Sequence, residues 1–210
     1  MGRTQVICTA SWVEGVDQWR KGSGKGWVTA EYGMLPASTS SRKPRPIAKP
    51  DGRGVEIQRL IGRVLRSVVC FEKLQERTIY LDCDVLQADG GTRTAAINGA
   101  YVALVLAVKK KMSLGLCPRG VITGAVAGVS VGIVDGKVLL DLDYSEDSGA
   151  QVDMNLAMTS KGEFVELQGT AEQKPFAPAE LEKMLAVGRT GIRKLIQAQR
   201  RAISQHSLHP

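Results

Sequence analysis

The stretch Asp89-Gly90-Gly91-Thr92-Arg93 stands between an alternating apolar run and a long apolar segment over residues 94–108. This order predicts a strand, a glycine turn and the start of a helix. Glycine accepts positive φ and lets backbone N–H groups come close to a ligand, and the first N–H groups of a helix have no partner inside it. Thr92 adds a hydroxyl and Arg93 a planar guanidinium suited to phosphate or carboxylate. The turn is therefore either an anion-binding site or a simple corner at which Thr92 caps the helix.

The segments around this turn predict an α+β fold. Apolar residues at every second position from Ile79 to Val85 indicate a strand before it, and the apolar segment after it indicates a buried central helix. Similar patterns predict strands over residues 4–10, 27–32, 126–134, 138–144, 151–159 and 163–167, and helices over residues 54–71 and 178–203. Strands in antiparallel runs with a few helices between them favour a mixed or antiparallel sheet with packed helices. We expect one domain over residues 1–203, followed by a polar tail over residues 204–210.

The charge of the chain favours a polyanionic partner. Over 210 residues the formal net charge is +7 and the sequence pI is near 9.4, and clustered cations concentrate phosphate backbones near a protein surface. Residues 38–53 form a Ser-, Pro-, Lys- and Arg-rich basic arm that includes Arg42, Arg45 and Arg53. This arm is either a disordered linker or an RNA-contacting segment.

The residue types present exclude several kinds of active site. Four cysteines without a Cys-x-x-Cys pair predict buried thiols in a reducing compartment. His206 and His209 both fall in the polar tail, which argues against a Ser-His-Asp triad, a Cys-His dyad or a His-rich metal site. The most apolar run, residues 95–108, is shorter than the ~20 residues of a membrane span. We expect a soluble, cytoplasmic protein that does not insert into membranes.

Acidic residues gather between residues 141 and 153. Asp141 and Asp143 are predicted to share one face of a strand, because side chains alternate along strands. Asp147 and Asp153 bracket the turn at residues 148–150, so we expect their carboxylates at one end of the sheet. Such a pair is suited to hold Mg²⁺ or to handle protons, and the alternative is a solvated acidic loop.

The turn, the arm and the carboxylates together suggest a reaction that needs no protein nucleophile. Inorganic phosphate held at the turn can itself attack a phosphodiester, with a metal bridging oxygens and an aspartate assisting the departing 3′ hydroxyl. This reaction class is consistent with the lack of a catalytic histidine or cysteine.

Residues 82–95, Asp-Cys-Asp-Val-Leu-Gln-Ala-Asp-Gly-Gly-Thr-Arg-Thr-Ala, resemble the signature of the ribonuclease PH family. The resemblance runs from residue 2 to about residue 199. It is supported by Gly-Trp-Val-Thr-Ala-Glu-Tyr-Gly-Met-Leu-Pro at residues 26–36, Glu-Ile-Gln-Arg-Leu-Ile-Gly-Arg at 56–63, Glu-Asp-Ser at 146–148, Val-Asp-Met-Asn at 152–155 and Gln-Gly-Thr-Ala-Glu at 168–172.

The resemblance implies a phosphate-dependent 3′ exoribonuclease that trims tRNA precursors, with rRNA and other RNA 3′ ends as further substrates, and releases nucleoside diphosphates. It also implies a fold shared with polynucleotide phosphorylase and exosome core subunits, assembled as a hexameric ring of three dimers. Carried over by matching motif, phosphate-binding roles fall on Arg53, Gly91, Thr92 and Arg93, Mg²⁺-assisted catalysis falls on Asp147 and Asp153, and tRNA contact falls on Arg42 and Arg45.

Two departures from the family pattern affect these expectations. Family members begin with an additional segment before the position of Gly2, so we expect the strand over residues 4–10 to lack one neighbour. The arm is also short and proline-rich, which concerns tRNA affinity more than phosphate binding. Two other functions stay open: a non-catalytic RNA-binding subunit of an exosome-like ring, and a metal nuclease that uses water in place of phosphate.

Overall fold

A computed structural model describes residues 1–45 and 51–206. Its strands are β1 (Gln5–Glu14), β2 (Trp27–Met34), β3 (Arg77–Gln87), β4 (Val126–Val134), β5 (Lys137–Leu140), β6 (Val152–Thr159) and β7 (Phe164–Ala171). Its helices are α1 (Gly52–Arg66), α2 (Phe71–Leu74), α3 (Thr92–Ser113), α4 (Tyr144–Ser148) and α5 (Pro178–His206).

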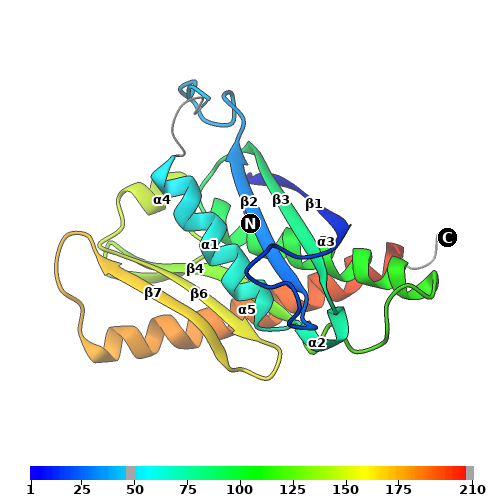
Figure 1. The fold of residues 1–210 in the computed structure, drawn as a ribbon. Coiled ribbons are helices and arrows are strands. Elements are labelled where there is room, and N and C mark those ends of the chain that lie inside the picture. Colours follow the sequence, from blue (N-terminus) through cyan, green and yellow to red (C-terminus); the bar gives the residue numbers. More distant parts are fainter. Residues whose placement is uncertain (46–50, 207–210) are drawn as a thin grey trace.

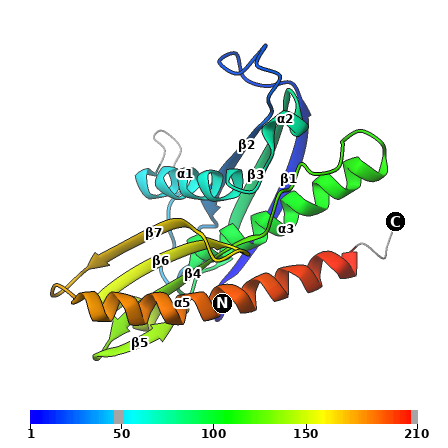
Figure 2. The same cartoon turned by 90° about the horizontal axis from the view of Figure 1, so that it is seen from below.

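The strands form two sheets. The first has the order β1-β3-β2, with β1 antiparallel and β2 parallel to β3, and the second has the order β5-β4-β6-β7 with antiparallel neighbours throughout. Helices α1 and α3 pack against the first sheet, α3 also packs against β4, and α5 packs against β4 and β5 (Figure 1). Figure 2 shows the first half of α5 running along the second sheet and its second half continuing beside α3. The α+β class with a mixed sheet is confirmed.

Helix α3 joins the two sheets. Its buried side chains are spread around its circumference, as expected for a helix enclosed by other elements. Asn98 fixes it to β4, because the side-chain amide donates to the Gly128 carbonyl at 2.8 Å and accepts from the Gly128 N–H at 3.1 Å. Gln199 of α5 donates to the same Asn98 side chain at 3.1 Å. A buried polar network of this kind fixes where α3, α5 and β4 meet.

Several predicted boundaries are corrected. The helix predicted over residues 54–71 begins at Gly52 and ends at Arg66, so Arg53 belongs to α1 rather than to the arm. Residues 46–50 of the arm and 207–210 of the tail, including His209, lie outside the described residues. Among the described residues, β1 pairs with β3 and forms an edge of its sheet.

The prediction that Asp141 and Asp143 share one face of a strand is wrong. Strand β5 ends at Leu140, and Asp141 takes a left-handed conformation with φ of +60°. Asp143 is the N-cap of α4, where its side chain accepts from the Glu146 N–H and the Glu146 side chain accepts from the Asp143 N–H. This capping box starts helix α4 directly after Asp143, so the chain cannot continue there as a strand.

Candidate active site

A cleft of about 790 Å³ opens between the start of α3, the arm and the second sheet. Six of the predicted site residues line it: Arg53, Gly91, Thr92, Arg93, Asp147 and Asp153. Arg42 and Arg45 are exposed and lie outside the residues that line this cleft, although their neighbour Lys43 lines it. Arg45 lines a smaller adjacent cavity of about 330 Å³. The structure therefore brings the predicted phosphate-binding residues and the two carboxylates together in one cleft, whereas the two arm arginines lie outside its lining.

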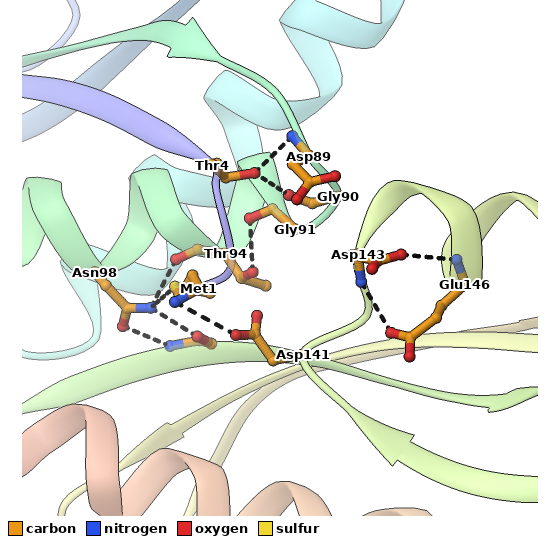
Figure 3. Close-up of polar contacts among 11 residues, drawn as sticks. Met1, Thr4, Asp89, Gly90, Gly91, Thr94, Asn98, Asp141, Asp143 and Glu146 are labelled. Carbon is orange, nitrogen blue, oxygen red and sulfur yellow. Dashed lines mark hydrogen bonds and ion pairs between the residues drawn. The ribbon is translucent and has the colours of Figure 1, made fainter.

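The glycine turn is required where it stands. Gly90 and Gly91 have φ of +73° and +55°, a region that favours glycine. A Cβ at Gly90 would overlap the carbonyl oxygen of Leu142 and lie 2.7 Å from the carbonyl carbon of Asp143. In Figure 3 the turn lies opposite the segment that carries Asp141 and Asp143. The turn and the approach to α4 therefore pack backbone against backbone at one end of the cleft.

Helix α3 starts without a side-chain cap. Gly91 is the N-cap and, within the described residues, no side chain bonds to the first N–H groups. Thr92 is the first residue of the helix, so the alternative in which it caps the helix is wrong. Its hydroxyl accepts a hydrogen bond from Tyr32 Oη at 2.8 Å, which leaves the hydroxyl proton of Thr92 available to donate. Uncapped N–H groups and the helix dipole together favour an anion here.

Two arginines line the cleft together with this helix start. Arg93 Nη1 lies 3.4 Å from Gln168 Oε1 of β7 and 3.7 Å from Glu56 Oε1 of α1, so the side chain is held between two elements. Arg53 lies in the first turn of α1 and lines the same cleft. The arrangement combines backbone donors with two cations, which matches the chemistry of a bound phosphate.

The two carboxylates come from different elements, Asp147 from α4 and Asp153 from β6. Burial raises the pKa of Asp153, the charge of Asp147 raises it further, and Arg93 partly offsets both. Asn155 Nδ2 lies 3.4 Å from Asp153 Oδ2. By contrast, Asp141 lies 3.4 Å from the Met1 amino group and Asp143 caps α4 (Figure 3). The acidic stretch thus divides into one pair that lines the cleft and others that are used locally.

The carboxylate pair fits Mg²⁺ better than a metal that needs a complete protein cage. Within residues 1–45 and 51–206, no three His, Cys, Asp or Glu side chains gather as a metal-binding group. Mg²⁺ is commonly held by one or two carboxylates together with substrate phosphate oxygens and water. Asp147 and Asp153 offer such carboxylates in the same cleft as the glycine turn.

Sequence reasoning missed two residues that line the cleft, Ser130 and Asn155, and one that lies behind it, Tyr32. Tyr32 supports Thr92 from β2, while Ser130 of β4 and Asn155 of β6 line the cleft. A signal existed for Ser130, because it is the single polar residue in the run Val-Ala-Gly-Val-Ser-Val-Gly-Ile-Val at residues 126–134.

The four cysteines are all free, but only Cys83 and Cys117 are buried, so the prediction of buried thiols is half right. Among the described helices, none is both long and apolar enough to cross a bilayer.

Both halves of the chain match known protein families. Residues 1–110 match the model of domain 1 of the 3′ exoribonuclease family, and residues 124–191 match that of domain 2. Ribonuclease PH of Neisseria meningitidis serogroup C is 57% identical over 205 residues, which are 97% of this chain and 85% of the relative. Ribonuclease PH of serogroup B of the same species has the same identity and coverage.

Solved structures share the fold at lower identity. Rice Rrp46 has a TM-score of 0.74 at 15% identity and covers 97% of this chain and 85% of its own. A chain of the Archaeoglobus fulgidus exosome with RNA bound to the active site has a TM-score of 0.76 at 20% identity, over 94% of this chain and 80% of its own. At these identities the likeness concerns the fold alone.

Proposed function

The chain belongs to the 3′ exoribonuclease family, and from this premise we propose that it shortens RNA from the 3′ end by phosphorolysis, with tRNA precursors as its principal substrates. The observation that carries the proposal is the cleft itself, in which an uncapped helix start, two arginines and two carboxylates converge. The 57% identity to ribonucleases PH supports the same activity. Further RNA 3′ ends, including those of rRNA, belong to the same substrate class.

In the proposed reaction, inorganic phosphate is the attacking group. One of its oxygens forms a bond to the phosphorus of the last phosphodiester, and the bond from that phosphorus to the preceding O3′ breaks. The products are a nucleoside 5′-diphosphate and an RNA one nucleotide shorter, whose O3′ gains a proton. The N–H groups of Gly91, Thr92 and Arg93, together with the Arg53 and Arg93 side chains, hold the phosphate and offset the charge that the transition state carries.

We propose Asp147 and Asp153 as the carboxylates that hold Mg²⁺. Their position beside the anion-binding turn and their mutual repulsion, which contributes to the raised pKa of Asp153, favour a cation between them. When bound, the ion would neutralise phosphoryl oxygens and the departing O3′. The carboxylates themselves orient the RNA end and handle its proton.

We further propose that Arg42 and Arg45 contact the tRNA backbone and that the protein acts in the cytoplasm as a hexamer of three dimers. Both side chains are exposed beside the cleft, where they would meet RNA that extends out of it. These proposals rest on the family match and on the position of the arm.

One incubation tests the function against its alternatives. The protein is mixed with 3′-extended tRNA and Mg²⁺, with or without inorganic phosphate, and the released nucleotides are identified by mass spectrometry. We expect nucleoside diphosphates only when phosphate is present. Monophosphates without a phosphate requirement would identify a hydrolytic nuclease, and RNA binding without any product would identify a non-catalytic subunit.

A further inference from the structure

The floor of the cleft contains a hydroxyl group without a partner. Ser130 of β4 is 4% exposed and lines the cleft, and its Oγ has no hydrogen-bond partner among the residues that the structure describes. A buried polar atom left unpaired is unfavourable, and such atoms are uncommon in folded proteins. The unpaired hydroxyl therefore indicates that a ligand atom in the cleft forms a hydrogen bond with it.

Ser130 lies in a polar row on the second sheet. It pairs with Asn155 of β6, which pairs in turn with Gln168 of β7, so the three side chains share the face that looks toward α3. The nearest β4 residues on this face are Gly128 and Gly132. Side chains of Ile97 and Leu142 lie over these two glycines, and Ser130 Oγ itself is buried, so the hydroxyl lies just beneath the surface of the cleft that Ser130 lines.

The row meets the anion-binding turn at two points. Gln168 contacts the guanidinium of Arg93 at 3.4 Å. A Cβ placed on Gly91 would lie 3.8 Å from Ser130 Oγ, so the hydroxyl stands directly beside the turn. An anion at the start of α3 would meet backbone donors and guanidinium groups on the helix side and the serine hydroxyl on the sheet side.

We propose that Ser130 is an additional ligand of the inorganic phosphate, to which its hydroxyl donates a hydrogen bond from the sheet side. The inference rests on the proposed function, because it names the same co-substrate in the same cleft. Phosphate carries more acceptor oxygens than the helix start can satisfy from one side, and a hydroxyl donor supplies what the opposite side lacks. Asn155, one strand away, lies closer to the carboxylate Asp153 and therefore to the RNA end.

The test measures phosphorolysis of one RNA as a function of phosphate concentration. Ser130→Ala is expected to raise the KM for phosphate about tenfold, the size typical of a hydrogen bond to a charged group, and to leave the KM for RNA unchanged. Ser38→Ala is the matched control, because Ser38 is also 4% exposed and its Oγ also lacks a hydrogen-bond partner among the described residues, but Ser38 lies outside the cleft lining. We expect Ser38→Ala to change neither KM.

A second measurement separates binding from folding. Phosphate should raise the Tm of the wild type more than that of Ser130→Ala at the same concentration, because a ligand stabilises the protein that binds it more tightly. If Ser130→Ala is poorly folded, Ser130→Cys retains a weak donor of similar shape and should give an intermediate KM.

The two proposals fail differently. If the wild type shows no phosphate-dependent cleavage, the proposed function is wrong and the inference falls with it. If the wild type is active but Ser130→Ala keeps its phosphate KM and its phosphate-induced Tm shift, the function stands and the role of Ser130 is refuted.

Discussion

At the scale of single residues, the cleft places charges where they are unfavourable for folding. Asp153 is half-buried, and burial followed by the charge of Asp147 raises its pKa. A carboxyl whose pKa is raised in the folded state binds its proton more tightly there than in the unfolded chain. Folding stability therefore falls as pH rises from the ordinary value of 3.8 through the raised value.

Asp153→Asn is expected to be more stable than the wild type at neutral pH, because the amide is never ionised. Below the ordinary pKa the wild-type carboxyl is protonated in both states, so the difference in Tm should vanish there and grow as pH rises. The measurement is thermal unfolding between acidic and neutral pH in a chelating buffer. Asp17→Asn, which removes a charge at an exposed aspartate in the loop before β2, is the control for the loss of one negative charge. A variant that loses stability at neutral pH would contradict the assignment.

Arg93→Ala should lower kcat for phosphorolysis by about 10²–10³-fold, by analogy with removal of one oxyanion-stabilising donor. The control is Arg63→Ala, because Arg63 bonds Glu166 of β7 at 2.8 Å and lies outside the residues that line the cleft. We expect the control to keep kcat near the wild-type value. Near-full activity of Arg93→Ala would remove Arg93 from the phosphate site.

At the scale of elements, local sequence patterns predicted individual strands and turns better than they predicted which strands pair. The hairpin of β4 and β5 follows from Asp135-Gly136, whose φ angles are +49° and +73°. The strand predicted over residues 138–144 was right for residues 138–140 and too long at its end, because Leu142 between two aspartates continues the alternating pattern, although Asp143 and Glu146 stood at capping-box spacing. The parallel pairing of β2 with β3 leaves no local signal, since it depends on tertiary packing.

The site was predictable in the same uneven way. Gly91, Thr92 and Arg93 are contiguous, and Asp147 and Asp153 flank one turn, so short-range patterns were enough to mark them as candidates, whereas their roles were assigned from the family resemblance. Ser130 and Asn155 lie 25 residues apart and meet only through the pairing of β4 with β6. A hydroxyl becomes a candidate ligand only when its surroundings are known to leave it unpaired.

Two glycine substitutions can measure how much the contact between the turn and the start of α4 contributes to the free energy of unfolding. Gly90 and Gly136 both have φ of +73°, but a Cβ at Gly136 meets no atom within 4 Å among the described residues. Gly136→Ala should therefore cost only the left-handed backbone penalty of about 1–2 kcal/mol. Gly90→Ala carries the same penalty plus overlap with Leu142 and Asp143, so its unfolding free energy should fall further. Equal losses in urea unfolding would show that the close packing contributes nothing.

At the scale of the whole molecule, the net charge of +7 favours association with RNA. If the arm contacts RNA phosphates, replacing Arg42 and Arg45 with alanine should weaken RNA binding and reduce the slope of log affinity against log salt by about 0.7 for each lost contact. The KM for phosphate should stay unchanged. Arg119→Ala, in an exposed loop after α3, is the matched control, and an unchanged salt slope in the arm variant would exclude the contact.

We propose that residues 1–203 form one domain, because α3 packs against both sheets and Asn98 connects it to β4 and α5. The three tryptophans, Trp12, Trp19 and Trp27, all lie in or beside the first sheet, so their fluorescence reports that half alone. Far-UV circular dichroism reports helices and strands of both halves. If the domain unfolds as a unit, the two signals should give the same urea midpoint. Separate midpoints would show that the halves matched by the two family models unfold independently, and that α3 does not couple them.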